Sequence, residues 1–265
     1  MTYFSHWLKV DYPELYAQII HALDKHRAPH KLLPVTNDVW CRDYMPIPLR
    51  SGGYLHYKYF PNYLNNNRDR KYITDAKVVS DSLGLDYTQT EIIVDGGNVV
   101  RCGDKVVMID KIFSENPHYS QAALIDRLEC LLEAELVFLP WDRAEKYGHS
   151  DGVVRDLCNG KVLLTNYKDY DEQIHEKFYN ILSRHFQVEE LSYTRSDQKD
   201  SSWAYINFLQ TDEVIILPKL CTHKDVEALE QMNRYFPQYE GRIEMVDARS
   251  IIKDGEAFNC ISWNS

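Results

Sequence analysis

The sequence lacks the features of a membrane, secreted or nucleic-acid-binding protein. No stretch approaches the roughly 18 consecutive apolar residues that a membrane span needs, and residues 1–15 contain no basic region followed by an apolar one. Its 30 lysines and arginines are outnumbered by 40 aspartates and glutamates, so the formal net charge of −10 argues against binding to a nucleic-acid backbone. We therefore expect a soluble cytoplasmic protein with neither nucleic-acid nor membrane partners.

Metal and redox motifs are also missing. The six cysteines include no pair at the CxxC spacing that is typical of zinc knuckles and redox sites, so we expect reduced, mostly structural thiols and no bound metal or cofactor. Hydrophobic residues at 44% and charged residues at 26% are ordinary globular values, which exclude disorder, collagen and coiled coil. A length of 265 residues suits a single domain over 1–265.

What the chain does contain is a repeated order of strand, strand, helix and strand. In the first copy, strands at Ile47–Arg50 and Tyr54–Phe60 flank a turn at Ser51–Gly53. A helix at Asp69–Leu83 and a strand at Thr90–Val94 follow. The same order recurs three times further along the chain, with first strands that begin at residues 98, 152 and 203.

A fifth copy is divided between the two ends of the chain. Its first strand is expected at Ala257–Trp263, and its remainder at Tyr3–Leu8, Pro13–His26 and Lys31–Val35. The five first strands then start at steady intervals of 51, 54, 51 and 54 residues. Because a split unit lets the last strand complete the first sheet, this pattern predicts an α/β fold, a closed five-unit ββαβ propeller. The alternative is a two-layer α+β domain with an ordinary alternation of strands and helices.

Residues that carry chemistry follow the same period. Asp43, Asp95 and His149 stand just before the first strands of three successive units, Asp151 follows His149 closely, and Cys260 lies about two further repeats along. If the first strands line the axis of the ring, these side chains converge at one mouth. Clustered carboxylates repel one another, so the arrangement is favourable only when a cation lies between them.

That cation is either a metal ion or an organic group. A thiol is a poor companion for a hard, oxygen-liganded ion, and a cysteine that binds zinc usually has a second Cys or His at short spacing. A guanidinium fits better because it is planar, always charged, and pairs with carboxylates through two hydrogen bonds at a time. Two carboxylates that hold its nitrogens leave its carbon open to a thiolate and to a proton from an imidazole.

Five segments of the sequence resemble signature stretches of a known family. They are NDVWCRDYMP at 37–46, DGGN at 95–98, GHSD at 148–151, SWAYINF at 202–208 and GEAFNC at 255–260. In this order they resemble the agmatine deiminase / bacterial-type peptidylarginine deiminase family, and the resemblance runs from about residue 37 to the end. It implies the fivefold pentein propeller of the guanidino-modifying enzymes, in agreement with the repeat.

The resemblance also implies roles. Cys260 is expected to be the nucleophile, His149 the general acid/base, Asp43 and Asp151 the guanidinium clamps, and Asp95 the matching acidic position. The implied reaction is the hydrolysis of a guanidine, agmatine first, to N-carbamoylputrescine and ammonia through a covalent amidino-cysteine, with no cofactor. An acidic chain favours a substrate with a distal ammonium over zwitterionic arginine, because a carboxylate would meet repulsion.

Further positions complete the expectation. Trp40 is expected to form a wall of the substrate pocket. The sequence departs from the family pattern at Met45 in place of Gly, at Asp95 in place of Glu and at Asn259 in place of His, and Glu256 falls in a Gly-rich stretch. These departures leave open the rest of the substrate and whether activity is altered. The corresponding residues of the fourth unit, expected to be structural, are Asp200, Ser202 and Tyr205.

Several alternatives stay open at this point. The same ring could act on free or peptidyl arginine or another alkylguanidine, or transfer the amidino group to an amine. From other classes, a metal-dependent hydrolase could use Asp43, Asp95, His149 and Asp151, and a non-catalytic protein could bind a guanidine without turnover. The sequence leaves the oligomeric state open, a homodimer included.

Overall fold

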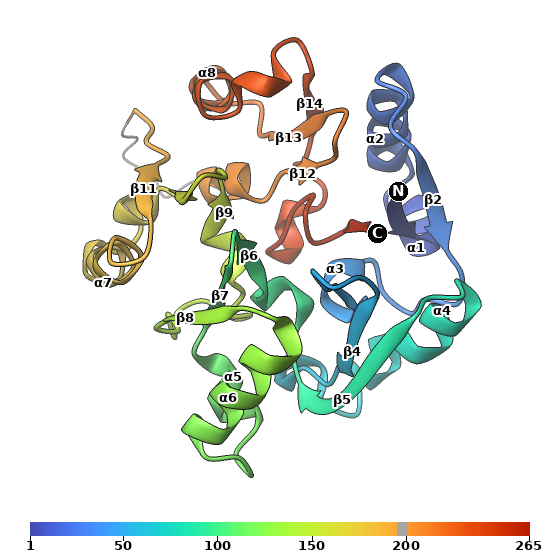
Figure 1. The fold of residues 1–265 in the computed structure, drawn as a ribbon. Helices are drawn as coiled ribbons and strands as arrows, with labels where there is room; N and C mark the ends of the chain where they lie inside the picture. The colour runs from blue at the N-terminus through green and yellow to red at the C-terminus, as the bar shows by residue number, and fades with distance from the viewer. Residues whose placement is uncertain (195–200) are drawn as a thin grey trace.

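The computed structural model describes residues 1–194 and 201–265 and contains five three-stranded sheets. The sheets are arranged around a common centre, and the longer helices lie towards the outside (Figure 1). In every sheet the first strand of the unit runs antiparallel to the second, and the second runs parallel to the third. A helix joins the second strand to the third in each unit, as a parallel pair requires. The predicted ββαβ order is therefore present five times.

The first unit shows why its helix is shorter than predicted. The expected helix at Asp69–Leu83 begins only at Ala76, because the Asp75 side chain accepts hydrogen bonds from the backbone N–H groups of Lys77 and Val78 and caps the helix there. The elements of this unit are α3 (Cys41–Tyr44), β3 (Ile47–Pro48), β4 (Tyr54–Lys58), η1 (Asn62–Leu64), η2 (Arg70–Tyr72), α4 (Ala76–Ser82) and β5 (Tyr87–Ile93).

The second and third units also have capped helices. Ser120 caps the long helix of the second unit and Asp171 that of the third, each through its side-chain oxygen. The second unit contains η3 (Gly96–Asn98), β6 (Val100–Cys102), β7 (Lys105–Ile109), α5 (Lys111–Glu115), α6 (Gln121–Leu132) and β8 (Glu135–Leu139). The third contains η4 (Ser150–Gly152), β9 (Val154–Asp156), β10 (Lys161–Leu164), η5 (Tyr167–Asp169), α7 (Glu172–Leu182) and β11 (Gln187–Glu190).

The predicted first strands of the last two units are corrected by the structure. Trp203–Leu209 is mainly a 3-10 helix, and Ala257–Trp263 is mainly a series of turns. Nearly every apolar side chain in these stretches is fully buried, so the apolar runs reflect burial rather than a strand. The fourth unit contains η6 (Ser202–Ile206), β12 (Leu209–Gln210), β13 (Ile215–Lys219), α8 (Lys224–Tyr235), η7 (Pro237–Tyr239) and β14 (Ile243–Asp247).

The fifth unit is divided between the two ends of the chain, as predicted. Thr2 pairs with Asn264 and Tyr3 with Trp263 in an antiparallel register, while β1 runs parallel to β2. Strand β1 ends at Ser5, whose hydroxyl accepts from the Trp7 N–H and begins a short helix. The elements are β1 (Thr2–Ser5), α1 (His6–Asp11), α2 (Pro13–Lys25), β2 (His30–Leu33), η8 (Ile252–Asp254) and β15 (Trp263–Asn264).

The apolar core forms three clusters between the sheets and the surrounding helices. The centre of the molecule is different, because short helical turns stand there in front of the first strands. Turns α3, η3, η4 and η6 contact one another in this order. Within residues 1–194 and 201–265, no helix is both long and apolar enough to cross a bilayer.

Candidate active site

The turns at the centre bring the predicted site residues together. Asp43 lies on α3, Asp95 stands directly before η3, and His149 and Asp151 lie at the start of η4. Cys260 lies in the turn before β15. All five side chains are buried, with at most 7% of any of these residues exposed. Residues separated by more than 200 positions in sequence thus share one buried site.

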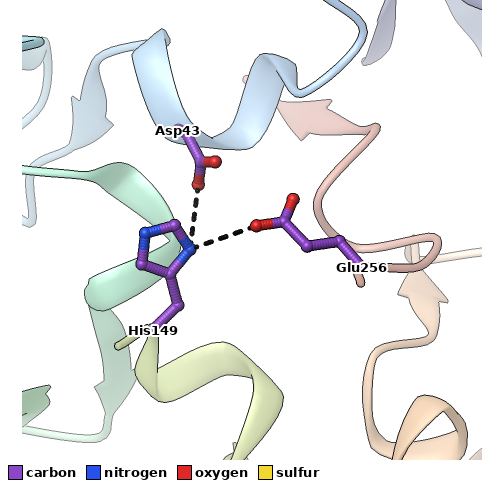
Figure 2. A group of neighbouring side chains, drawn as sticks. All are labelled: Asp43, His149 and Glu256. Carbon is purple, nitrogen blue, oxygen red and sulfur yellow. Dashed lines mark ion pairs between the residues drawn. The ribbon is translucent and has the colours of Figure 1, made fainter. Parts of the chain in front are cut away.

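His149 is surrounded by three carboxylates. Its Nε2 lies 3.1 Å from Asp95 Oδ2, and its Nδ1 lies 3.6 Å from Asp43 Oδ1 and 3.5 Å from Glu256 Oε1 (Figure 2). Burial acts to lower the pKa of His149, but the negative charges of Asp43, Asp95 and Glu256 outweigh it and raise the pKa well above its usual value. The imidazole is therefore held as a cation that can donate a proton.

Asp95 is held by a buried lysine that the sequence analysis did not single out. Lys111 Nζ donates to Asp95 Oδ2 at 2.6 Å and lies 3.1 Å from Glu115 Oε1, and its side chain is completely buried. Burial acts to raise the pKa of Asp95, but Lys111 and His149 keep that pKa below its usual value. Asp95 therefore stays ionised and serves as the partner of His149. A lysine two positions after the end of the apolar strand β7 was the available signal.

The DGGN segment has a steric reason for its second glycine. The Gly97 N–H donates to Asp43 Oδ1 at 3.0 Å. A Cβ at position 97 would lie 2.6 Å from Asp43 Oδ1 and 2.8 Å from His149 Nδ1, so no side chain fits between them. Burial, together with Glu256, Asp95 and Asp151, raises the pKa of Asp43 well above its usual value despite the opposing effect of His149. A ligand cation beside Asp43 would stabilise its ionised form and so lower this pKa.

Cys260 is positioned by a polar network on the opposite side of the site. Its Sγ accepts a hydrogen bond from Asn207 Nδ2 at 3.1 Å and donates to Asp151 Oδ2 at 3.4 Å. Asn207 Oδ1 also accepts from the backbone N–H groups of Asn259 and Cys260. Burial, followed by the charges of Asp151, Glu256 and Asp43, raises the pKa of Cys260 well above its usual value. The sequence analysis had included Asn207 in a motif but given it no role.

Asn259 connects Asp151 to Arg155, a partly buried arginine. Its Nδ2 donates to Asp151 Oδ2 at 2.6 Å, while its Oδ1 accepts from Arg155 Nη1 at 2.7 Å. Arg155 also stacks over the Phe208 ring, with 4.4 Å between the guanidinium carbon and the ring centroid. Burial lowers the pKa of Arg155 to about 10. Asn259, which departs from the family pattern, therefore orients Asp151, one of the two predicted guanidinium clamps.

The site opens into a cavity of about 350 Å³ that is lined by polar or charged residues and by aromatic residues. His149, Asp151, Glu256 and Cys260 are among the residues that line it. None of the described residues that line it is a lysine or an arginine. Its other aromatic and acidic lining residues are Tyr147, Tyr167, Tyr170, Phe178, Trp203, Asp142, Glu145 and Asp171.

Trp40, Ser202 and Tyr205 do not line the cavity, and neither do Asp43 and Asp95. Trp40 packs against the apolar cluster of the fourth and fifth units rather than lining the cavity, where the aromatic wall is instead formed by residues such as Trp203. Ser202 accepts from Asn166 Nδ2, and the Tyr205 hydroxyl donates to Asp225, and both contacts join neighbouring elements of the fold. Asp200 lies outside the described residues.

Comparisons with known proteins agree with the fold. The agmatine deiminase of Pseudomonas aeruginosa is 24% identical over 214 residues, which span 66% of this chain and 58% of that enzyme. The agmatine deiminase of C. jejuni has a TM-score of 0.71 at 16% identity, covering 89% of this chain and 75% of that one. The enzyme of Enterococcus faecalis has a TM-score of 0.67 at 21% identity, covering 84% and 73%.

These similarities give the fold and, through the family match, the classification. A dimethylarginine dimethylaminohydrolase of Pseudomonas aeruginosa also superposes, with a TM-score of 0.59 over 94% of this chain and 86% of that one at 15% identity. The α/β fold is therefore the one shared by agmatine deiminases and this hydrolase, the pentein fold. Since residues 14–265 match the profile of the Porphyromonas-type peptidyl-arginine deiminases, the chain belongs to that family.

Proposed function

We propose that this protein is a cysteine-dependent guanidine deiminase that converts agmatine to N-carbamoylputrescine and ammonia. The observation that carries the proposal is the pairing of the buried Cys260 thiol with Asp151, close to an imidazolium at His149. The family match supports the reaction class. Closure of the five units into a propeller belongs to the same proposal and is supported by the pairing of β15 with β1.

The first half of the reaction needs a bound cation. Asp43 and Asp151 are positioned to pair with the guanidinium nitrogens, each of which donates hydrogen bonds. The positive charge then offsets the carboxylates that raise the pKa of Cys260, so binding favours loss of the thiol proton to solvent and leaves a thiolate. Attack of Sγ on the guanidinium carbon forms a C–S bond, and His149 donates a proton to the nitrogen that leaves as ammonia.

The second half regenerates the thiol. His149, now neutral, accepts one proton from a water molecule that attacks the amidino carbon. The C–S bond then breaks as the remaining hydroxyl proton passes to the sulfur, which releases the ureido product and the thiol. Asp95, which Lys111 keeps ionised, holds the Nε2 side of the ring in both halves. His149 thus acts as acid and then as base without changing its place.

The cavity lining favours agmatine over arginine as substrate. Asp142, Glu145 and Asp171 attract the distal ammonium of agmatine, and the aromatic rings accommodate its methylene chain. The α-carboxylate of arginine would meet these negative charges, and no lysine or arginine of the described lining would compensate them. This substrate choice rests on charge alone.

The experiment compares ureido product from agmatine, free arginine and an arginine-containing peptide at equal concentration. We expect agmatine to react fastest, activity to be lost in Cys260→Ala, and activity to survive EDTA. Cys130→Ala, at an exposed cysteine, is the matched control and should retain full activity. An arginine rate at or above the agmatine rate would overturn the substrate, and activity in Cys260→Ala would overturn the mechanism.

A further inference from the structure

A second cavity, of about 550 Å³, is lined by residues from the first strand of every unit, namely β3, β6, β9, β12 and β15. No residue of these strands lines the active-site cavity. The two cavities share Asp151, and they take adjacent residues of the turn before β15, with Cys260 in the active-site cavity and Asn259 in the second cavity. The second cavity therefore borders the active site through the turn that carries the proposed nucleophile.

Three arginines line the second cavity, and the proposed reaction assigns none of them a charged partner. They are Arg42, Arg101 and Arg155, and each is partly buried. Within residues 1–194 and 201–265, no carboxylate oxygen lies within 4.0 Å of a nitrogen of these guanidinium groups. Because taking a charge out of water is costly unless the charge is paired, three such arginines in one cavity need a separate explanation.

Two of the arginines converge on one residue. Arg42 Nε donates to the backbone oxygen of Asn259 at 3.4 Å, and Arg155 Nη1 donates to Asn259 Oδ1 at 2.7 Å. The two guanidinium groups are therefore held near one another, and after burial the positive charge of Arg42 is the largest cause that lowers the pKa of Arg155. An anion between them would replace this repulsion by two attractions.

Several N–H donors of these arginines are unused. Arg42 makes no hydrogen bond through Nη1 or Nη2 to any described residue. Arg101 Nη1 is buried without a hydrogen-bond partner in the described part of the chain, whereas its Nη2 donates to Leu132 O. A guanidinium presents its N–H groups in a planar fork that matches two oxygens of one carboxylate or phosphate. The unused donors thus indicate a ligand with acceptor oxygens.

The acidic side chains of the cavity do not pair with the arginines by contact. They are Asp151, Asp156, Asp212 and Glu213. Asp151 Oδ2 accepts from Asn259 and Cys260, and Asp156 Oδ1 accepts from the Cys158 N–H. An anion would therefore displace no existing ion pair of the arginines. Because the acidic side chains repel an anion elsewhere in the cavity, they confine it to the arginines.

We propose that the second cavity binds a small oxyanion, one that offers phosphate or carboxylate oxygens, between Arg42 and Arg155. The cavity volume falls within the range of about 300–1,000 Å³ that is typical of small-molecule sites. Asn259 contacts both arginines and also donates to Asp151, so it links the anion site to a predicted clamp. Binding of the anion does not depend on the proposed deiminase reaction, because the arginines and not the thiol make the contacts.

Calorimetry on the unmodified protein tests the site with two probes, pyrophosphate and citrate, which distinguish phosphate from carboxylate ligands. We expect one site for at least one probe. In Arg42→Gln, binding should be weaker by about tenfold or more, because charge-assisted hydrogen bonds are lost. Lys105→Gln removes the same charge from a lysine of β7 outside the cavity, and this control should retain the affinity. Binding of neither probe, or equal affinity in Arg42→Gln and the unmodified protein, would overturn the proposal.

A second measurement locates the anion and does not depend on the folding of any variant. Crystals of the unmodified protein soaked in selenate, an oxyanion with a strong anomalous signal, should show a peak within hydrogen-bond distance of both Arg42 and Arg155. Adding the probe that binds in calorimetry should remove this peak. A peak only at exposed arginines such as Arg68, whose side chain is 93% exposed, would contradict the site. Neither measurement involves turnover, so both decide the anion site even if the proposed deiminase reaction fails.

Discussion

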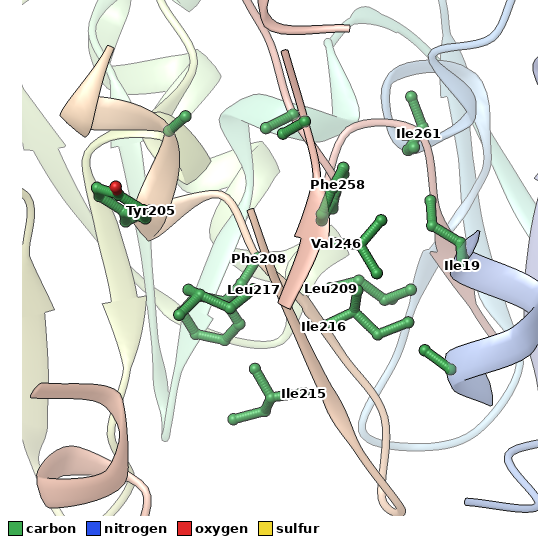
Figure 3. Packing of buried hydrophobic residues seen from close by; sticks show 14 of the residues in the cluster. Ile19, Tyr205, Phe208, Leu209, Ile215, Ile216, Leu217, Val246, Phe258 and Ile261 are labelled. Atoms are coloured by element: carbon green, nitrogen blue, oxygen red, sulfur yellow. The ribbon is translucent and has the colours of Figure 1, made fainter. Parts of the chain in front are cut away.

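The apolar cluster around β13 and the charged centre show two opposite uses of burial. In the cluster, Ile215, Ile216 and Leu217 are completely buried, so both faces of the strand are covered (Figure 3). In the centre, carboxylates and an imidazole (Figure 2), together with Lys111, are buried to a similar degree. Burying apolar surface stabilises a fold, whereas burying charge costs free energy unless each charge is paired.

The two regions meet in the turn that carries the nucleophile. Phe258 and Ile261 flank this turn and pack in the apolar cluster, while Cys260 between them faces Asn207 and Asp151 (Figure 3). The cluster thus supplies the rigidity that a strained polar site needs. The comparison predicts that changes at the centre affect activity, and that changes in the cluster affect stability.

The largest expected effect is a loss of activity without a loss of stability. In Asp43→Asn, the guanidinium loses the counter-charge of one carboxylate in a buried pocket. We expect kcat/KM to fall on the order of a thousandfold, which corresponds to a loss of about 4 kcal/mol in transition-state stabilisation. Because burial raises the pKa of Asp43, removing its charge should leave the melting temperature unchanged or higher. Steady-state kinetics and calorimetric melting test this, and a variant with near-normal activity but a lower melting temperature would reverse the comparison.

The energetic effect of burying charge can be measured by removing one lysine from a buried ion pair and one from an exposed ion pair. Lys111→Met leaves Asp95 buried with His149 as its one remaining cation among the described residues, and we expect the free energy of unfolding to fall by about 3–5 kcal/mol. Lys77 pairs with Asp81 at the same i,i+4 spacing as Lys111 with Glu115, but on the surface. Lys77→Met is therefore the control, and its urea midpoint should not move. Equal shifts of the urea midpoint in the two variants would show that burial does not increase the contribution of Lys111 to stability.

Truncation of Phe258 tests the apolar side of the shared turn. Phe258→Ala removes a fully buried ring, so urea denaturation should show a loss of about 3–5 kcal/mol in the free energy of unfolding. Val226→Ala, at a valine that is 63% exposed on α8, should leave stability almost unchanged. A loss below about 1 kcal/mol for Phe258→Ala would mean that the cluster does not anchor the turn.

The smallest expected effect concerns the reactivity of the resting thiol. Burial and the nearby carboxylates raise the pKa of Cys260, so its alkylation by iodoacetamide should keep rising beyond pH 9. In Asp151→Asn one of the negative charges is gone, the thiolate is less disfavoured, and the rise should shift to lower pH by a modest amount. Peptide mass spectrometry measures both rates. A plateau below pH 8 in the unmodified protein would contradict the assigned environment.

The repeat and the main site residues could be predicted because both follow a period. In the structure the first strands begin at intervals of 53, 54, 55 and 54 residues, close to the predicted intervals. Asp43, Asp95 and His149 hold equivalent places before these strands, so their convergence follows from the fold. The burial of Lys111 and the function of Asn207 could not be predicted, because each depends on contacts between units that no local pattern records.

Some predictions of secondary structure failed because a stretch of buried apolar residues in a turn resembles the pattern of a buried strand. The apolar stretches at Trp203–Leu209 and Ala257–Trp263 were interpreted as strands, yet their side chains are buried in turns at the centre. Trp40 packs with the apolar cluster and does not line the cavity, and its expected part in the substrate pocket stays a prediction. Glu256 was recognised only as a departure from the family pattern, and its contact with His149 became visible in three dimensions.

The pairing of β15 with β1 has a consequence for the order of folding events. Thr2 and Asn264 are neighbours in one sheet although 262 positions separate them, and the terminal residues Met1 and Ser265 are also hydrogen bonded. Contacts of such long sequence separation form slowly, because the entropy of closing the intervening chain must be overcome before they are made. The turn with Cys260 directly precedes β15. We therefore expect the turn with Cys260 to become fixed in its final place only when the two ends of the chain have joined, so that a partly folded chain lacks a fully positioned nucleophile.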